Sequence, residues 1–246
     1  MIYKFLKFRD NLLQDKGLIL RATQRKFLND PFEFRPPKKL TDKIKEFYLR
    51  TGMPEPSYEK MCDSFYRLHG VISFTESKSN LLMWSHYADG HKGLVLEFNP
   101  QNNFFNDLNR VKYDSVISDH ILNSINIDDN DTFFKLFYIK SDEWIYEKEH
   151  RIIREFSGSD YYLKGEAIRE GKDSVYSDET VFFAVPYDAL LKIYFGCEME
   201  ETHKKYFFDE LNKKAPENNF KFYEAAQAEH VFGLEFKEID TERFIT

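Results

Sequence analysis

The sequence predicts an α+β fold: a single domain over residues 1–246, with a mixed, largely antiparallel sheet and helical insertions. Three observations lead to this prediction. Short, glycine-bounded runs rich in β-branched and aromatic residues are typical of strands. Runs with apolar residues at helical spacing lie between them. A length of 246 residues suits one large domain, and elements mixed in this way are typical of the α+β class.

The first part of the chain predicts an opening strand followed by a shaped loop and helices. Residues 1–8 alternate apolar and basic side chains, as a strand does. NLLQDKGLILRA predicts a short helix, a glycine stop and a second strand, and the turn-forming residues of 27–37 predict a loop. Apolar residues at helical spacing over 38–68, broken by GMPEPS, predict a helical insertion of two helices.

The remaining chain predicts more strands and two more helices. Strands are expected at 70–77, 93–99, 110–113, 149–156, 180–186 and 190–196, and helices at 132–140 and 202–214. The last 27 or so residues suggest a strand, a turn and a further strand. The segment 157–179 is rich in glycine and charge, which predicts a mobile surface loop.

Composition and charge narrow the function classes. No run approaches the roughly 18 apolar residues that a membrane span needs, and the charged start is unlike a signal peptide. We therefore expect a cytoplasmic protein that does not act in a membrane. A formal net charge of −7 argues against a general nucleic-acid coat. A local basic patch that includes Arg151 and Arg154 stays open.

Two glutamates stand out in DEWIYEKEHRIIRE. If a strand begins here, Glu147 and Glu149 point to the same side of it. Close carboxylates raise one pKa and leave the other group ionised, which suits acid/base work or the stabilisation of a cationic transition state. The alternative is a solvated strand end, whose acids pair with Lys148 or Arg151.

The segment LLMWSHYADGHKGLVLEF concentrates specialised side chains. We expect Trp84 and Tyr87 to form an aromatic pocket wall that could stack on a nucleotide or nicotinamide ring. Asp89 and Gly90 would form a turn that positions His91. Core packing is the alternative for the two aromatic residues. His86 and His91 are five residues apart with no obvious third ligand, so no metal is expected.

The motif NDPFE predicts a structured turn. Asn29 and Asp30 precede Pro31, so their side chains can cap turn amides while the proline fixes the backbone. The alternative is that these two residues grip the ribose or an amide of a ligand.

Several motifs together resemble one uncharacterised bacterial family, a domain of unknown function. The motifs are NDPFE, MWSHYADGHKG and WIYEKEHRI, supported by ISFTES, IKSDE and IYFGCE. This likeness extends over nearly the whole chain. The family usually has tryptophan where this chain has His150.

The order of elements also resembles the ADP-ribosyltransferase fold with its split sheet, especially the DNA-targeting toxin branch. That resemblance implies that Lys4 or Tyr3 lies where the family places a His or Arg that contacts NAD. Ser73 and Thr75 would supply the second motif. Glu149 would be the catalytic acid and Glu147 its partner, as in an ExE pattern. The residues expected to bind the cofactor are Lys4, Asn29, Asp30, Ser73, Thr75, Trp84, Tyr87 and Arg151, and those expected to be catalytic are Glu149, Glu147 and His91.

The function that follows from this resemblance is an NAD-consuming ADP-ribosyltransferase or glycohydrolase. It would be a toxin or phage-defence effector that acts on nucleic acid or protein, with an antitoxin or immunity partner. A fixed carboxylate near the ribose would stabilise the oxocarbenium-like charge of the transition state. Two alternatives stay open: a noncatalytic nucleotide- or nucleic-acid-sensing module, and a metal-dependent nuclease or hydrolase that uses Asp30 with Glu147 and Glu149.

Overall fold

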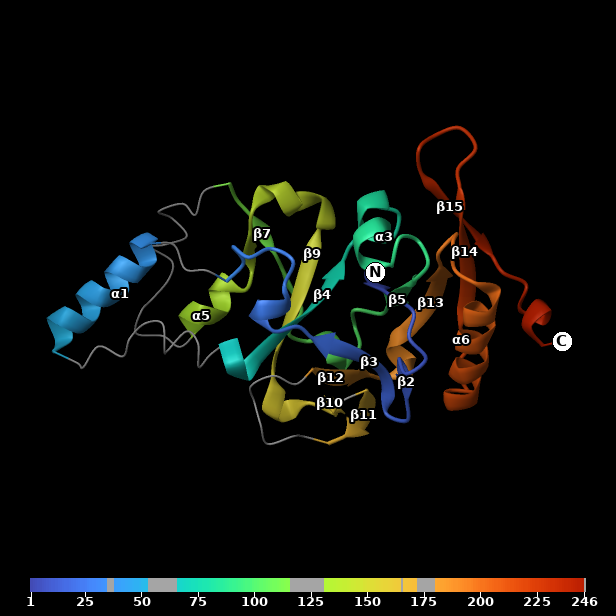
Figure 1. Cartoon of the computed structure of the whole chain (residues 1–246), viewed down its shortest axis with the longest axis horizontal. Helices are drawn as coiled ribbons and strands as arrows, with labels where there is room; N and C mark the ends of the chain where they lie inside the picture. The colour runs from blue at the N-terminus through green and yellow to red at the C-terminus, as the bar shows by residue number, and fades with distance from the viewer. Residues whose placement is uncertain (35–37, 53–65, 116–130, 165, 172–179, 246) are drawn as a thin grey trace.

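Two sheets form the body of the protein in the computed structural model, which describes residues 1–34, 38–52, 66–115, 131–164, 166–171 and 180–245 (Figure 1). In these ranges the larger sheet, sheet A, contains β15 (Leu234–Glu238), β14 (Lys221–Gln227), β13 (Leu190–Phe195), β5 (Leu94–Phe98), β1 (Ile2–Leu6), β4 (His69–Thr75), β9 (Glu149–Glu155) and β6 (Asn109–Arg110), in that spatial order. The smaller sheet, sheet B, contains β11 (Ala167–Glu170), β10 (Tyr161–Lys164), β12 (Val181–Val185), β3 (Gly17–Ala22) and β2 (Leu13–Gln14).

The pairing of the strands is largely antiparallel. Among the described strands, only β13 with β14 and β7 (Lys112–Tyr113) with β8 (Ile139–Lys140) pair in parallel. The described α-helices are α1 (Lys38–Thr51), α3 (Leu81–Tyr87), α5 (Asp131–Leu136) and α6 (Glu201–Lys214). The predicted α+β class with a largely antiparallel sheet is therefore confirmed. None of the helices in the described ranges is long and apolar enough to cross a membrane.

The hydrophobic core lies on both faces of sheet A, as the alternation of its strands requires. On one face, side chains such as Leu96 and Phe195 join residues of sheet B and of α6, including Leu20 and Phe207, in one buried cluster. On the other face, α3 covers Phe5 and its neighbours in a second cluster. Sheet A thus separates the main core from a smaller core under α3.

Sheet A divides between β1 and β4. These two strands pair at a single position, Tyr3 with Thr75, whereas β1 pairs with β5 at five positions and β4 with β9 at seven. Beyond that point β4 turns to sheet B, where Val71 bridges to Thr23. The divergence of β1 from β4 leaves a gap in the sheet, on the face that α3 covers.

Four segments differ from the sequence-based expectation or extend beyond what the structure describes. Where a short helix was expected, Leu13 and Gln14 form the short strand β2, because Leu13 pairs with Leu18 in a hairpin. The helix expected over 132–140 ends at Leu136, and its last residues form β8. The segment 157–179 contains β10 and β11, and residues 172–179 lie outside the described ranges. In the helical insertion expected at 38–68, α1 is present, and residues 53–65 lie outside the described ranges.

Candidate functional site

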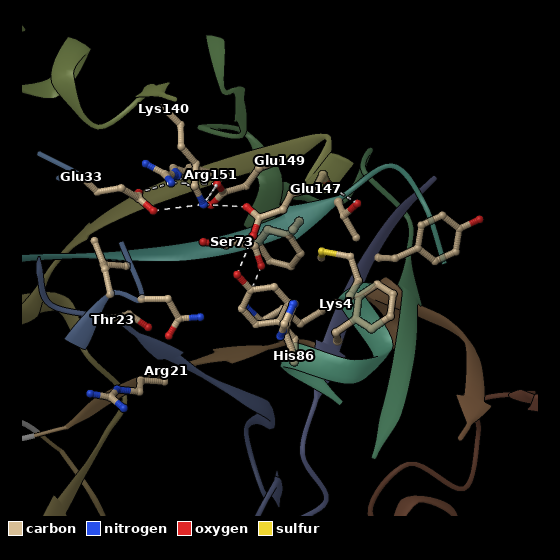
Figure 2. Close-up of a pocket in the computed structure, with 18 of the residues that line it drawn as sticks. Lys4, Arg21, Thr23, Glu33, Ser73, His86, Lys140, Glu147, Glu149 and Arg151 are labelled. Carbon is tan, nitrogen blue, oxygen red and sulfur yellow. Dashed lines mark hydrogen bonds and ion pairs between the residues drawn. The ribbon is translucent and has the colours of Figure 1, made fainter. Parts of the chain in front are cut away.

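A pocket of about 310 Å³ occupies the gap between β1 and β4 (Figure 2). Its walls come from β1, β4, the start of β9, helix α3 and the chain that follows β3. In Figure 2 five charged side chains lie along one side of the pocket, and Arg21 and Thr23 lie on the opposite side. We call these five residues the charge cluster: Glu33, Lys140, Glu147, Glu149 and Arg151.

Lys140 joins the three carboxylates of the cluster. Its Nζ lies 2.6 Å from Oε2 of Glu147, 3.0 Å from Oε1 of Glu33 and 3.4 Å from Oε2 of Glu149. All four side chains are almost fully buried, with Glu147 only 3% and Glu149 only 4% exposed. Buried carboxylates this close would repel one another strongly, so the single ammonium between them is required for all three to be ionised.

Arg151 holds Glu149 from the other side. Its Nε donates to Oε1 of Glu149 at 2.7 Å, and its Nη2 donates to Oε2 at 2.8 Å. The same guanidinium also pairs with Glu33 and donates to the Phe137 carbonyl at 2.6 Å. The cluster therefore contains three carboxylates and two cations, and it carries one negative charge in excess when all are ionised.

Local backbone geometry places the two glutamates of the EKE motif beside each other. Glu147 ends the 3₁₀ helix η3 (Asp142–Glu147), and Lys148 then adopts a left-handed conformation with φ of 44°. Glu149 begins β9. The Thr75 hydroxyl donates to the Glu147 carbonyl at 2.6 Å and fastens this turn to β4. Alternation along one strand is therefore not the reason that the two carboxylates meet.

The two glutamates have opposite pKa shifts. Burial alone would raise the pKa of Glu149, but Arg151 and Lys140 outweigh it and lower the pKa to about 2. A hydrogen bond from the Ser73 side chain acts in the same direction. Burial raises the pKa of Glu147, Lys140 opposes that rise, and the Glu149 charge adds to it. Glu149 is thus the permanently ionised member of the pair.

Tyr87 and Lys4 complete the polar lining of the pocket. The Tyr87 hydroxyl donates to Oε1 of Glu147 at 2.5 Å, and burial raises the pKa of this phenol, with the Glu147 charge as the next cause. Nζ of Lys4 donates to the Ser73 carbonyl at 2.6 Å. Burial lowers the pKa of Lys4 to about 8, and Glu149 and Glu147 offset part of that effect.

The charged wall of the pocket lies mostly in a segment that is similar to a known family. Residues 83–152 match the model of a family described as "Protein of unknown function (DUF2971)". The family resemblance inferred from the motifs is confirmed over these residues, and no curated protein and no solved structure matches the chain.

The DUF2971 segment contributes most of the charged wall. Lys140, Glu147, Glu149 and Arg151 lie within it, together with Tyr87 on α3. The opposite wall, with β1 and β3, comes from chain outside the matched residues. The pocket therefore forms where the DUF2971 segment meets the N-terminal strands.

Eight of the predicted site residues line the pocket together. They are Lys4, Asn29, Ser73, Thr75, Tyr87, Glu147, Glu149 and Arg151. The predicted approach of the EKE motif to the Tyr87 segment is therefore present. The donors of Arg151 are engaged with Glu33, Glu149 and a carbonyl, so it positions Glu149 instead of presenting a free guanidinium to a ligand.

The prediction that Trp84 walls the pocket is wrong. Its side chain is 0% exposed and packs edge-on against Phe5 in the core under α3. Its Nε1 donates to the Lys78 carbonyl at 2.7 Å. Met83 and Tyr87 line the pocket instead, because residues four apart share a helix face and Trp84 is rotated toward the sheet.

The placement of His91 at the pocket is also wrong. Asp89, Gly90 and His91 all have positive φ, so the expected turn is present. This turn directs the His91 ring back onto Trp84, where the two rings stack with centroids 5.9 Å apart. Nδ1 of His91 is buried without a hydrogen-bond partner in the described part of the chain. His91 thus packs against the core and does not line the pocket.

Asp30 and Arg154 lie away from the pocket as well. Oδ1 of Asp30 accepts a hydrogen bond from the Phe32 amide at 2.8 Å, as the turn-capping interpretation of NDPFE predicts, and Asp30 lines a separate, smaller cavity. Arg154 pairs with Asp107. The metal alternative placed Asp30 beside the two glutamates. Lys140 instead occupies the space between the clustered carboxylates. In addition, the described residues contain no group of three or more acidic, His or Cys side chains arranged to hold a metal ion.

Sequence reasoning missed three important members of the site. Glu33 belongs to NDPFE, but the turn argument gave it no role. Lys140 precedes SDEW and was expected at the end of a helix. His86, on α3, lines the pocket beside Tyr87. The one available signal was that Lys140 and Glu33 both lie in motifs of the family resemblance.

Proposed function

We propose that this pocket binds NAD and that the protein is an ADP-ribosyltransferase-like enzyme that breaks the bond between nicotinamide and ribose. The observation that carries the proposal is the split in sheet A. At the split, Tyr3, Thr75 and Glu149 are in register across β1, β4 and β9. This order resembles that of the ADP-ribosyltransferase fold. In that fold, one strand contacts NAD, a second carries a Ser or Thr, and a third begins with the catalytic glutamate.

The electrostatics of the pocket suit this substrate. The carboxylates of Glu147 and Glu149 favour the positive nicotinamide ring and the positive charge that develops on the ribose at their wall of the pocket, whereas Lys4, Lys7 and Arg21, which also line the pocket, carry positive charge that suits the phosphates. With its pKa near 2, Glu149 keeps its charge at neutral pH. A carboxylate has about four acceptor sites, so Oε1 of Glu149 can still accept a bond from a ribose hydroxyl beside Arg151.

Glu147 is the group suited to move a proton. In the proposed reaction the C1′–N bond breaks and its electron pair leaves with neutral nicotinamide, while an oxygen or nitrogen of the acceptor bonds to C1′ and loses a proton. Glu147, whose pKa is raised, can accept that proton on a remaining lone pair, with Tyr87 hydrogen-bonded to its Oε1 and Lys140 to its Oε2. Water as acceptor gives glycohydrolase activity, and a macromolecular acceptor gives ADP-ribosyl transfer.

The test is release of nicotinamide from NAD, measured by chromatography, for the wild type and for Glu149→Gln and Glu147→Gln. Removal of a charge that acts mainly in the transition state should lower the rate about 100-fold or more. Thermal unfolding of each variant establishes that it is folded at the assay temperature. An intact NAD pool after prolonged incubation with folded wild-type protein would contradict the proposal.

Glu97→Gln is the matched control for Glu147→Gln. Glu97 is also a buried carboxylate on sheet A, and it accepts hydrogen bonds from Tyr194 at 2.5 Å and Lys192 at 2.9 Å. It lies outside the pocket. The control should therefore carry a similar structural cost while nicotinamide release is unchanged.

A second function is favoured by the double hydrogen bond from Arg151 to Glu149. A glutamate held in this way can be a structural part of a binding pocket without taking part in catalysis. The protein would then bind a nucleotide as a sensing module. A rise in melting temperature with NAD, together with no nicotinamide release over hours, would favour this function.

The cellular setting is part of the proposal. An enzyme that consumes NAD would act in the cytoplasm, where its substrate is, as a toxin or phage-defence effector. Such an activity would harm its own cell unless it were restrained, so we include an antitoxin or immunity partner. Co-purification from a bacterial host of a second protein that suppresses nicotinamide release would support this part.

A further inference from the structure

Strand β15 forms one end of sheet A, and its outer edge has no partner strand in the described part of the chain. In Figure 1 the β14–β15 hairpin extends beyond the body of the protein. At the opposite end of the sheet β6 has only two residues, whereas β15 has five. An edge strand presents a row of unpaired amide and carbonyl groups to which another strand can add. β15 is therefore the longer of the two edges at which sheet A can be extended.

The pairing with β14 decides which residues of β15 direct their backbone outward. The Ala228 amide donates to the Gly233 carbonyl at 3.0 Å, and the Ile239 amide donates to the Phe222 carbonyl at 2.9 Å. In an antiparallel pair, residues that bond to the partner alternate with residues whose amide and carbonyl groups point the other way. The odd-numbered residues of β15 therefore bond to β14. Three residues present both backbone groups to the outer edge: Leu234, Phe236 and Glu238.

The charges of β15 have opposite signs on the two sides of Phe236. Glu235 precedes this residue and Lys237 follows it, and both side chains are exposed on the other face of the sheet. Neither forms an ion pair within the ranges that the structure describes. Glu224, the neighbour of Lys237 on β14, pairs with Lys204 instead. The edge strand thus carries one acid and one base that are available to a partner.

These charges complement a second copy of the same strand. If two antiparallel copies meet at Phe236, Glu235 of each copy lies opposite Lys237 of the other, so a twofold axis produces two favourable pairs. A shift of two residues in either direction would instead place Glu235 opposite Glu235, or Lys237 opposite Lys237. Charged side chains on an edge strand discourage pairing, but here they discourage the shifted registers and favour the centred one.

The centred register also satisfies the free backbone groups. Phe236 faces Phe236 of the second copy and Leu234 faces Glu238, so every outward residue meets an outward residue and the two can exchange hydrogen bonds. The antiparallel arrangement brings the start of one β15 toward the end of the other. Phe232, just before β15, is 99% exposed, and Ile245, shortly after it, is 74% exposed. Exposed apolar side chains at both ends of the edge favour an association that covers them.

We propose that β15 pairs with β15 of a second copy of this chain, in an antiparallel register centred on Phe236, and joins the two A sheets into one continuous sheet. The charges and the direction of the backbone groups agree on this one register. Strands β14, β13 and β5 separate β15 from β1, so the contact involves no residue of the pocket. The dimer is therefore independent of the proposed enzymatic function and is tested without NAD.

The experiment is sedimentation-velocity ultracentrifugation over protein concentrations from about 1 to 200 µM, where we expect a reversible monomer–dimer equilibrium. Glu235→Lys and Lys237→Glu should each raise the dimer dissociation constant about tenfold or more, because each converts two opposite-charge pairs into like-charge pairs. The double variant Glu235→Lys/Lys237→Glu restores opposite charges. It should therefore return the dissociation constant to within about threefold of the wild-type value.

Glu238→Pro tests the backbone pairing separately. The Glu238 amide points away from β14, so proline removes an outward donor and places its ring at the outer edge, which a solvent-facing edge strand tolerates. This variant should weaken dimerisation about tenfold or more, because the loss occurs twice in a symmetric dimer. Glu238→Ala is the matched control. It keeps the amide, so it should change the dissociation constant by less than about threefold.

Lys213→Glu, at an exposed position of α6, is the control for net charge. It makes the same change of charge as Lys237→Glu and should leave the dissociation constant unchanged. Thermal unfolding of each variant establishes that it is folded at the temperature of the run.

Four results would overturn the proposal. The first is a wild type that stays monomeric at the highest concentration. The second is a dimer that is unchanged in folded Glu235→Lys and Lys237→Glu, or that Lys213→Glu weakens equally. The third is a double variant that stays monomeric although both single variants lose the dimer, which would exclude the centred register. The fourth is a dimer that persists undiminished in folded Glu238→Pro, which would exclude pairing at this edge.

Discussion

Lys140 is the residue on which the electrostatics of the pocket depend. It is one of two cations in the cluster, and it is the one that touches all three carboxylates. Arg151 pairs with Glu33 and Glu149 but not with Glu147. Loss of Lys140 would therefore leave Glu147, which is only 3% exposed, with a hydrogen bond from Tyr87 and no directly paired cation.

Lys140→Met is expected to lower the free energy of unfolding by about 3–5 kcal/mol at pH 7, because breaking a buried ion pair from one side leaves an uncompensated charge. The pKa of Glu147 is already above its ordinary value of 4.5 and Lys140 holds it down, so the substitution raises it further. A carboxyl group with a raised pKa in the folded state costs stability above that pKa, and the cost disappears as pH falls toward 4.5.

Urea unfolding at pH 7 and at about pH 4.5 checks this prediction. The difference in stability between the wild type and Lys140→Met should be smaller at the lower pH. Lys213→Met, at an exposed position on α6, should change the free energy of unfolding by less than about 0.5 kcal/mol at either pH. An equal loss at both pH values would show that lost packing, and not charge, is the cause.

At the scale of elements, the sequence predicted those with a clear periodicity and glycine boundaries. The strands at 93–99, 149–156 and 190–196 are present as β5, β9 and β13, and the helix at 202–214 is α6. The elements that the sequence predicted wrongly are short segments. Leu12 and Leu13 are adjacent apolar residues that fit a helix or a strand, and only their contacts with β3 decide between the two.

The break between α5 and β8 matters more for the site. Residues 132–140 have a helical pattern, but the helix ends at Leu136 and Lys140 pairs with Tyr113 as part of β8. This change of conformation brings the Lys140 side chain to the carboxylates. A helix continued to residue 140 would follow its own periodicity, so sequence alone gave no reason to place Lys140 in the site.

The turn that joins α3 to β5 depends on a close approach of two segments. A Cβ atom at Gly196 would lie 1.9 Å from the His91 carbonyl oxygen, and the Gly196 amide donates to the Gly93 carbonyl at 2.9 Å. Gly196→Ala should therefore displace this turn and destabilise the protein by more than about 2 kcal/mol. Thermal or urea unfolding measures the loss.

Gly158→Ala is the control for that substitution. The nearest atom to a Cβ at Gly158 is in the Phe183 ring, at 3.7 Å, which is an ordinary contact. It should change stability by less than about 1 kcal/mol. If Gly196→Ala were as stable as this control, the tight packing of the α3–β5 turn against the end of β13 would be contradicted.

For the whole molecule, the sequence placed the EKE motif and Tyr87 at one pocket, although some 60 residues separate them. It could not identify the charge partners. Glu33, Lys140 and Arg151 come from three segments, and ion pairs between distant segments leave no periodic trace in a sequence. For Trp84 the sequence predicted a site residue where there is none. Its polar neighbours suggested a place in the pocket wall, but the side chain packs in the core.

The common core of the two sheets predicts that the protein unfolds as one unit, as a single domain should. Leu20 of sheet B is fully buried in the same cluster as Leu96 and Phe195 of sheet A. Leu20→Ala should cost about 2–5 kcal/mol. In a Trp144→Phe background, Trp84 fluorescence reports the core on the far face of sheet A, while far-UV circular dichroism reports both sheets.

The two signals should shift together in Leu20→Ala, because a cavity in sheet B weakens the packing that also supports sheet A. If sheet B were an independent unit, circular dichroism would show an early transition while Trp84 kept its native fluorescence to the wild-type midpoint. That result would contradict the single-domain prediction. It would also detach Thr23 from Val71, and so the pocket would lose one wall before its charge cluster was disturbed.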